Sequence, residues 1–223
     1  RGDNSVRILD VATGTTLAAL TGHSDDILSV RWSPDGNLIA SASADTTVLI
    51  WDAATGALLQ TLTGHNAPVW SISWAPDSTQ LAVAASLAAT DDVSNNRIYV
   101  WNSSDGTLAT TLESDGSPIW SVSWSPDGQT MAAGTNNGLV RLWEMESGEP
   151  TDELSGNGSP LWSVSWSPDG SQLAAAEGDL NGAGGNNGVQ LWDDEFDAIT
   201  NPLAQATSPV ISVSWAPDSE RLG

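Results

Sequence analysis

One short segment recurs five times along the chain, and it constrains the fold more than any other feature. Its copies read DILSVRWSPDG, PVWSISWAPDS, PIWSVSWSPDG, PLWSVSWSPDG and PVISVSWAPDS. Each copy begins with alternating apolar and small polar residues, which favours a strand, and ends in Pro-Asp-Gly or Pro-Asp-Ser, which favours a tight turn. Such self-similarity is typical of a fold in which one supersecondary unit is repeated and stacked.

Three further strands are predicted after each copy. The second strands read LIASAS, LAVAAS, MAAGT and LAAAE, and the third end on tryptophan in TVLIWD, RIYVWN, LVRLWE and GVQLWD. A turn then leads to a fourth strand such as ALLQTL or TLATTL. Full repeats span 21–62, 63–112, 113–154 and 155–203. Residues 204–223 carry the first two strands of a fifth repeat, and residues 1–20 carry the last two.

This repeat resembles the Trp-Asp (WD) repeat of β-propellers, and the resemblance covers the whole chain. The best match is segment 21–62, in which Gly22-His23 and Trp51-Asp52 stand at the two dipeptides that characterise the family. The resemblance implies an all-β fold: a β-propeller of four-stranded antiparallel blades, forming a single domain over 1–223. It has five repeat equivalents, and the fifth blade is split between the N- and C-termini.

Closure of the ring has three possible outcomes. The split blade amounts to nearly one whole repeat, which favours a five-bladed ring made by one chain. Two chains could instead exchange halves and form a ten-bladed homo-oligomeric ring. A third outcome is an open arc, which would expose two sheet edges and favour aggregation.

The resemblance also implies a hydrogen-bonded set in each blade: a histidine, a second-strand Ser or Thr, a turn aspartate and the third-strand tryptophan. Only the first repeat supplies every member. We expect these residues, including both histidines, to be structural rather than catalytic. The first repeat has His23, Ser41 or Ser43, Asp45 and Trp51; the second has His65, Asn95 and Trp101; the third has Asp115, Asn137 and Trp143; the fourth has Asn157, Asn186 and Trp192; and the split repeat has Ala206, Asp3 and Leu9.

Two insertions suggest where a partner would bind. Residues 86–96 and 177–187 lengthen the connection between the second and third strands, and loops that vary on one rim are typical of recognition. The resemblance places the start of the first strand on the same rim, the top face. The side chains there either form an exposed apolar ring or pack between blades, as we expect of Trp32, Trp74, Trp124, Trp166 and Trp215. The candidate partner-binding residues are Leu28, Trp70, Trp120, Trp162 and Ile211, with Asp91, Asp92 and Asp179 from the insertions.

Composition narrows the class of function. Six Lys and Arg residues against 28 Asp and Glu residues give a formal net charge of −22, which disfavours nucleic acid and anionic membranes and favours a basic partner. The chain contains no cysteine and no apolar run of membrane-span length, so thiolate metal sites and disulfides are excluded.

The leading prediction is a non-catalytic scaffold that binds a protein or peptide, with no cofactor or metal. One alternative is a purely structural or engineered propeller without a selected ligand. The other is a carboxylate-based glycosidase, which would need two carboxyl groups roughly 5–10 Å apart across a pocket.

Overall fold

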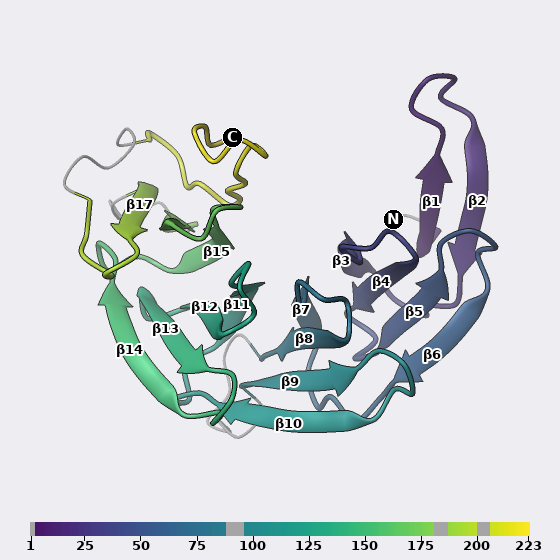
Figure 1. Ribbon diagram of the computed structural model, residues 1–223, viewed down its shortest axis with the longest axis horizontal. Helices are drawn as coiled ribbons and strands as arrows, with labels where there is room; N and C mark the ends of the chain where they lie inside the picture. Colours follow the sequence, from purple (N-terminus) through teal and green to yellow (C-terminus); the bar gives the residue numbers. More distant parts are fainter. Residues whose placement is uncertain (1–2, 88–95, 181–186, 200–205) are drawn as a thin grey trace. The chain divides into compact units, whose positions relative to one another are not determined.

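The computed structural model describes residues 3–87, 96–180, 187–199 and 206–223, and these residues form strands and turns without a helix (Figure 1). The chain divides into two compact units, Arg1–Thr111 and Leu112–Gly223. The all-β prediction is therefore confirmed. The strands are β1 (Ser5–Leu9), β2 (Thr16–Thr21), β3 (Ile27–Trp32), β4 (Leu38–Ser43), β5 (Val48–Asp52), β6 (Leu58–Leu62), β7 (Val69–Trp74), β8 (Gln80–Ala85), β9 (Arg97–Asn102), β10 (Leu108–Glu113), β11 (Ile119–Trp124), β12 (Thr130–Thr135), β13 (Leu139–Glu144), β14 (Pro150–Ser155), β15 (Leu161–Trp166), β16 (Gln172–Glu177) and β17 (Gly188–Asp193).

The first unit contains two four-stranded antiparallel sheets, β3-β4-β5-β6 and β7-β8-β9-β10, and the two-stranded sheet β1-β2. The second strands β4 and β8 consist of apolar and small residues apart from Gln80, which suits strands with both faces buried. Alanines keep these strands thin, while larger side chains such as Ile50, Ile72 and Trp74 fill the core between the two sheets. The result is a pair of stacked blades.

The second unit repeats this plan in the four-stranded sheet β11-β12-β13-β14 and the sheet β15-β16-β17. Leu142, Leu161 and Trp192 belong to the core between them. Every first strand ends in a tight turn whose Gly or Ser has positive φ, as the Pro-Asp-Gly pattern predicts; Gly128 and Gly170 are the examples in this unit.

Two parts of the predicted blade pattern differ in the structure. The fourth repeat has three strands rather than four among the described residues, and the returning chain meets β17 only at the bridge between Trp192 and Ala198. The turn before this bridge is one residue shorter than its counterparts, since Asp193 N–H donates to the Asp197 carbonyl whereas Asp52 N–H donates to that of Ala57. In residues 206–223 a single bridge, Trp215 to Leu222, replaces the two predicted strands.

The split fifth blade is therefore present only in part. β1 and β2 form the predicted third and fourth strands in the first unit, whereas the residues predicted as its first two strands belong to the second unit. Closure within one chain or by exchange stays a prediction.

Trp32 corrects one expectation. It was predicted to pack between blades, but 52% of its surface is exposed. The counterpart Trp74 is buried, and its indole Nε1–H donates to the Arg31 carbonyl on the preceding first strand, at 3.3 Å. Trp215 likewise donates to Ser165. Trp32 lies on β3, the earliest first strand of its unit, so no preceding first strand there offers it the carbonyl that Trp74 uses. Trp124 has the same place in the other unit but is buried and donates to the Gly128 carbonyl of its own turn, so this place alone does not decide the exposure.

Candidate partner-binding surface

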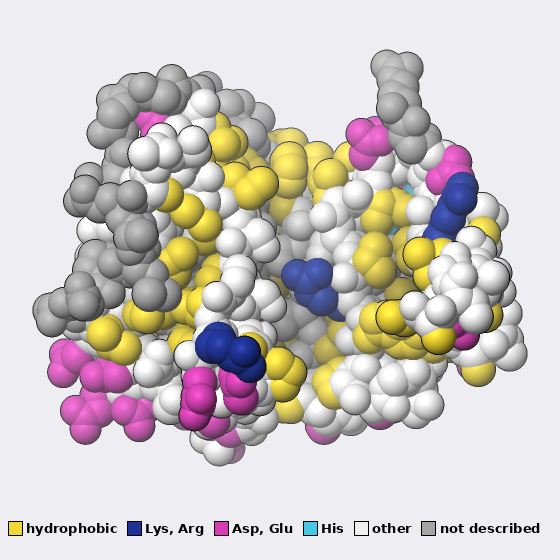
Figure 2. Space-filling model, turned by 90° about the horizontal axis from the view of Figure 1, so that it is seen from above, with side chains coloured by type: hydrophobic (Ala, Val, Ile, Leu, Met, Phe, Trp, Pro, Cys, Tyr) yellow, Lys and Arg dark blue, Asp and Glu magenta, His cyan; other side chains and the backbone are white. Residues whose placement is uncertain are grey.

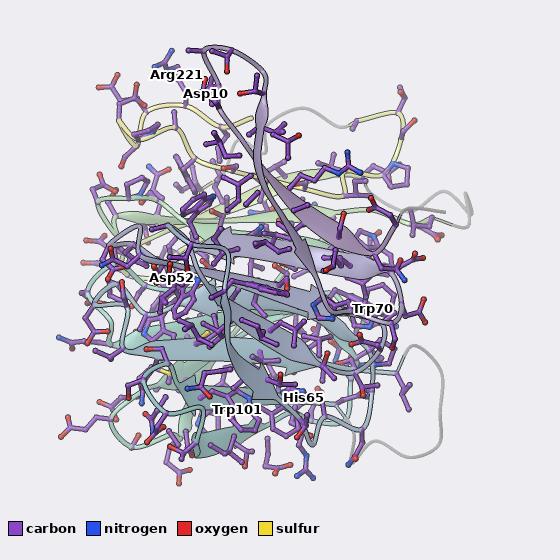
Figure 3. The ribbon with its side chains drawn as sticks, turned by 90° about the vertical axis from the view of Figure 1, so that its right-hand side faces the viewer. Asp10, Asp52, His65, Trp70, Trp101 and Arg221 are labelled. Atoms are coloured by element: carbon purple, nitrogen blue, oxygen red, sulfur yellow. The ribbon has the colours of Figure 1, made fainter. Side chains whose placement is uncertain are left out.

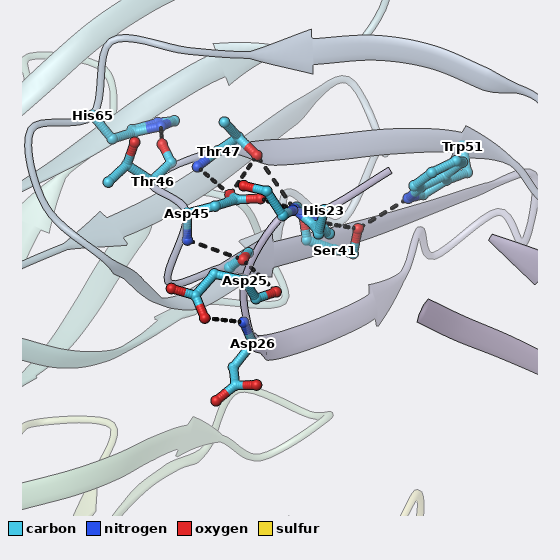
Figure 4. Close-up of polar contacts among 11 residues, drawn as sticks. His23, Asp25, Asp26, Ser41, Asp45, Thr46, Thr47, Trp51 and His65 are labelled. Atoms are coloured by element: carbon cyan, nitrogen blue, oxygen red, sulfur yellow. Dashed lines mark hydrogen bonds and ion pairs between the residues drawn. The ribbon is translucent and has the colours of Figure 1, made fainter. Parts of the chain in front are cut away.

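The first blade contains the complete hydrogen-bonded set (Figure 4). His23 Nδ1 lies 2.9 Å from Asp45 Oδ2, and His23 Nε2 lies 2.9 Å from Ser41 Oγ. Trp51 Nε1–H donates to the same hydroxyl at 2.9 Å. Ser41 is therefore the second-strand member. Ser43 instead supports the turn, because its hydroxyl accepts from the Asp45 amide.

The Asp45 carboxylate is the centre of this set. Burial alone would raise its pKa, but hydrogen bonds from Thr47, Ser24 and His23 outweigh burial and lower the pKa to about 2. Asp45 therefore stays ionised at neutral pH and favours a His23 tautomer that carries its proton on Nδ1. Nε2 can then accept from Ser41, whose oxygen accepts from Trp51. Every polar group of the set has a partner, which favours the structural role.

The second blade keeps its histidine without the serine. Val83 occupies the register position of Ser41, opposite the first strand. Trp101 Nε1–H donates directly to His65 Nε2 at 3.2 Å (Figure 3). His65 Nδ1 lies 3.0 Å from the Thr46 carbonyl (Figure 4). The His65 ring also packs edge-on against Tyr99. Burial lowers the pKa of His65, so the neutral ring is favoured. Asn95 lies outside the described residues.

The third blade replaces the histidine by a carboxylate. Asp115 accepts from Asn137 Nδ2 at 3.2 Å and lies 3.6 Å from the Arg141 guanidinium. Arg141 also pairs with Glu153. Trp143 remains fully buried. In the third blade, polar side chains therefore still contact one another where the first blade has His23 and Asp45, but the contact is between a carboxylate, an amide and a guanidinium.

The fourth blade contains a buried carboxyl group that the sequence analysis missed. Glu177 is the last residue of β16 and is fully buried, at the position that Ser43 and Thr135 occupy in other blades. It accepts from both the backbone N–H and the side-chain amide of Asn157. Burial raises the pKa of Glu177, and the Asn157 bonds oppose the rise. The available signal was a glutamate ending the otherwise apolar run LAAAE.

The predicted rim tryptophans are anchored by their indole N–H groups. Trp70 donates to the Ser86 carbonyl at 2.9 Å, and Trp162 donates to the Gly178 carbonyl at 2.7 Å; both side chains are half-buried. Trp120 is only 7% exposed and stacks on Trp162, with ring centroids 5.2 Å apart. The hydrogen bonds fix the orientation of the Trp70 and Trp162 rings, which are partly exposed to solvent, whereas Trp120 is buried.

The other predicted rim residues are placed as follows. Leu28 is half-buried and lines a small cavity with Asp3 and Asp26. Asp3 itself is exposed and pairs with Arg7. Ile211 is 64% exposed. The backbone N–H of Asp179 donates to Asn187 Oδ1. Asp91, Asp92, Asn186 and most of both insertions lie outside the described residues.

Acidic and hydrophobic side chains are both exposed on the face that Figure 2 shows. Among the residues described, no group of three His, Asp or Glu side chains could hold a metal ion. In the same residues we find no helix with the length and hydropathy needed to cross a membrane. Glu177 has Asn157 as its hydrogen-bond donor.

The comparisons with known proteins agree with the repeat. The family model described as the IFT122 first beta-propeller matches residues 1–223. A stretch of 40 residues is 50% identical to Ribosome assembly protein 4 of Saccharomyces cerevisiae, covering 18% of this chain and 8% of that protein. A stretch of 43 residues is 46% identical to Coronin-7 of Mus musculus, covering 19% of this chain and 5% of that protein.

These curated relatives are matched over less than a tenth of their own length, so they support the repeat rather than a whole-protein activity. The family model, in contrast, covers the entire chain. WD-repeat propellers are typically non-enzymatic scaffolds for protein interaction. The chain belongs to the family of the IFT122 first beta-propeller, a family of WD-repeat β-propellers.

Proposed function

We propose that this chain is a non-catalytic scaffold that binds a basic protein or peptide at the rim where the first strands begin. The observation that carries the proposal recurs in each unit, at Trp70 in the first and at Trp162 in the second. Both rings are partly exposed although their indole N–H groups are bonded to the backbone. A rigid, partly exposed aromatic side chain loses little conformational freedom on binding, which is typical of interface anchors.

Charge supports a basic partner. The chain has a formal net charge of −22, and exposed Asp25 and Asp26 lie immediately before β3 at this end of the first blade. A negatively charged surface speeds association with a cationic partner and disfavours acidic competitors. An interaction of this kind weakens as salt screens the charges.

The test compares capture of partner proteins from a cell lysate by the wild-type chain and by Trp70→Ala and Trp162→Ala variants. The control is Leu58→Ala, which removes a partly exposed apolar side chain from β6. We expect each tryptophan variant to lose bound proteins that the wild-type chain and the control retain. Melting curves identify any variant that is merely unfolded.

Retention of all partners by folded Trp70→Ala and Trp162→Ala variants would contradict the proposal for this rim. A purely structural propeller, the second candidate, would capture no saturable partner with any variant.

A further inference from the structure

A second candidate site lies in the second unit, at the opposite end of the first strands from the rim tryptophans. The turn after β11 and the turn after β15 enclose an open cavity of about 500 Å³, and the turn after β17 forms its third wall. This volume is within the usual range of ligand pockets. The lining residues include Pro126, Asp127, Trp166, Asp169, Asp194 and Phe196.

Three carboxylates give the cavity its charge. Asp127 and Asp169 each use Oδ1 to hold their own turns, and serine hydroxyls lower the pKa of both, that of Asp169 to about 2. Neither Oδ2 atom accepts a hydrogen bond from a described residue. Asp194 is exposed and makes no hydrogen bond or ion pair with a described residue. No basic side chain lines the cavity. Its negative charge is therefore not neutralised from within.

Two aromatic rings form the apolar part of the wall. Trp166 and Phe196 meet edge to face, with centroids 6.1 Å apart and planes at 67°. Phe196 is the chain's only phenylalanine, and its backbone has a φ of 64°. In the corresponding turns of the first and second blades this left-handed position is held by Gly56 and Gly106.

A bulky residue is strained at such a φ, and local strain of this kind concentrates at functional sites. The fourth blade thus maintains an unfavourable backbone conformation at the residue that places an aromatic ring over the cavity.

The Trp166 indole differs from those of Trp74, Trp124 and Trp215, each of which donates to a backbone carbonyl. Trp74 and Trp215 donate Nε1–H to a carbonyl of the preceding first strand. Trp166 Nε1 is buried and has no partner among the described residues. Its ring is held by packing alone, so it can change its tilt without breaking a hydrogen bond.

We propose that this cavity binds the side chain of an arginine from a partner protein or peptide. A guanidinium is planar and always charged; it can stack on an aromatic face while its fork donates to carboxylates on either side. Trp166 and Phe196 supply the faces, and Asp127, Asp169 and Asp194 supply the acceptors. Lysine fits less well because its ammonium is more strongly hydrated and cannot stack as a plane.

This site is separate from the rim of the proposed function, and the two can fail independently.

The experiment titrates the ¹⁵N-labelled chain with the blocked tripeptides acetyl-Gly-Arg-Gly-amide, its lysine analogue and its citrulline analogue. Citrulline keeps the shape of arginine and removes the charge. The Trp166 indole signal is assigned with a Trp166→Phe variant. We expect saturable shifts of that signal with arginine, weaker binding by about fivefold with lysine, and none with citrulline.

Two variants and one control distinguish specific binding in the cavity from nonspecific attraction of a cationic peptide to an acidic chain. Phe196→Gly removes the ring but relieves the strained φ, so we expect the melting temperature to rise by about 2 °C while affinity falls about fivefold. Asp194→Asn should also weaken binding. Glu195→Gln changes the charge equally on an adjacent exposed residue outside the cavity wall, and should leave binding unchanged.

Equal affinity for the arginine and lysine peptides, equal losses in the Asp194 and Glu195 variants, or undiminished binding by Phe196→Gly would overturn the proposal. Because none of these variants alters Trp70 or Trp162, partner capture at the rim gives an independent result.

Discussion

The same cavity occurs twice in the molecule, once in each unit, with similar size and different chemistry. Asp35, Asp77 and Ser78 help to enclose a cavity of about 490 Å³ in the first unit, where Asp127, Asp169 and Gly170 help to enclose one of about 500 Å³ in the second. The turns, and therefore the backbone frame, correspond.

The walls of the two cavities differ. In the first unit the Ser78 hydroxyl accepts from the Asp35 amide at 3.2 Å, and the nearby apolar side chain is Leu59. In the second unit Gly170 has no hydroxyl to offer, and Trp166 and Phe196 form the wall. The repeat thus determines the frame of the cavity, and single departures from it determine what the cavity can bind.

The opposite ends of the strands show the same contrast. In the first blade the four side chains His23, Ser41, Asp45 and Trp51 satisfy one another, whereas in the fourth Asn157 supports a buried Glu177. One network is complete around an ionised aspartate. The other holds a carboxyl group in an environment that disfavours its charge.

The largest effect is expected from Asp45→Ala. The change removes the acceptor of four hydrogen bonds, including those from His23 and Thr47, and leaves buried donors without partners. We expect the free energy of unfolding to fall by about 3 kcal/mol, measured by urea denaturation at pH 7. Asn137→Ala in the third blade, where the equivalent network is reduced, should cost about 1 kcal/mol. Equal losses would contradict the contrast between blades.

Acidification should also reveal the contribution of Asp45 to stability. The pKa of Asp45 is lowered to about 2 in the folded state, below its ordinary value of 3.8. The unfolded chain therefore binds the proton first, and the stabilisation present above pH 4 is lost as the pH falls toward 2. The Asp45→Ala variant should lose less stability than wild type over this interval.

Glu177→Gln should have a smaller effect of opposite sign. The pKa of Glu177 is raised above 4.5 by burial, so the folded chain binds the proton more tightly than the unfolded chain. The contribution of Glu177 to stability is therefore most favourable below pH 4.5 and declines as the pH rises through the folded pKa. Glutamine removes the charge and keeps one carbonyl oxygen, which can accept from one of the two Asn157 donors.

At pH 7 we expect the variant to gain about 1 kcal/mol in the free energy of unfolding, and to lose this part of the pH dependence. Glu146→Gln, an exposed substitution on the turn after β13, is the matched control and should change neither. A less stable Glu177→Gln chain with unchanged pH dependence would show that the carboxylate is not disfavoured.

The repeat made most of the fold predictable. Alternating strands, Pro-Asp-Gly turns and terminal tryptophans predict the positions of β3 to β17, because the same pattern recurs in each repeat and the repeats can be aligned with one another. The first-blade network was predictable for the same reason, through His23 and Asp45. The exposure of Trp32 was not, since Trp124 stands at the same position of a nearly identical segment and is buried.

Glu177 and Phe196 were missed for a physical reason. Both occupy positions at which other blades carry a small residue. Glu177 has the regular spacing, 11 residues after Trp166 as Ser43 is 11 after Trp32, so only its residue type is unusual; Phe196 also follows an irregular length of chain. Phe196 is four residues after Trp192, whereas Gly56 is five after Trp51, so alignment by spacing does not bring them together. Their common position becomes visible only through the positive φ of the two turns.

The smallest effect, and the sharpest test of the two cavities, is expected from Gly170→Ser. Ser78 has a φ of 64° and Gly170 a φ of 76°, so serine can adopt this conformation here at some cost relative to glycine. Its hydroxyl would accept from the Asp127 amide as Ser78 accepts from Asp35. Because strain and hydrogen bond oppose each other, the free energy of unfolding should change by less than about 0.5 kcal/mol. The Asp127 amide signal should shift. Affinity for the arginine tripeptide should fall, because a Cβ at position 170 would lie 3.3 Å from Pro126 Cγ and would occupy space at the cavity wall. An unchanged Asp127 signal would mean that the two cavities share a shape but not a hydrogen-bonding frame.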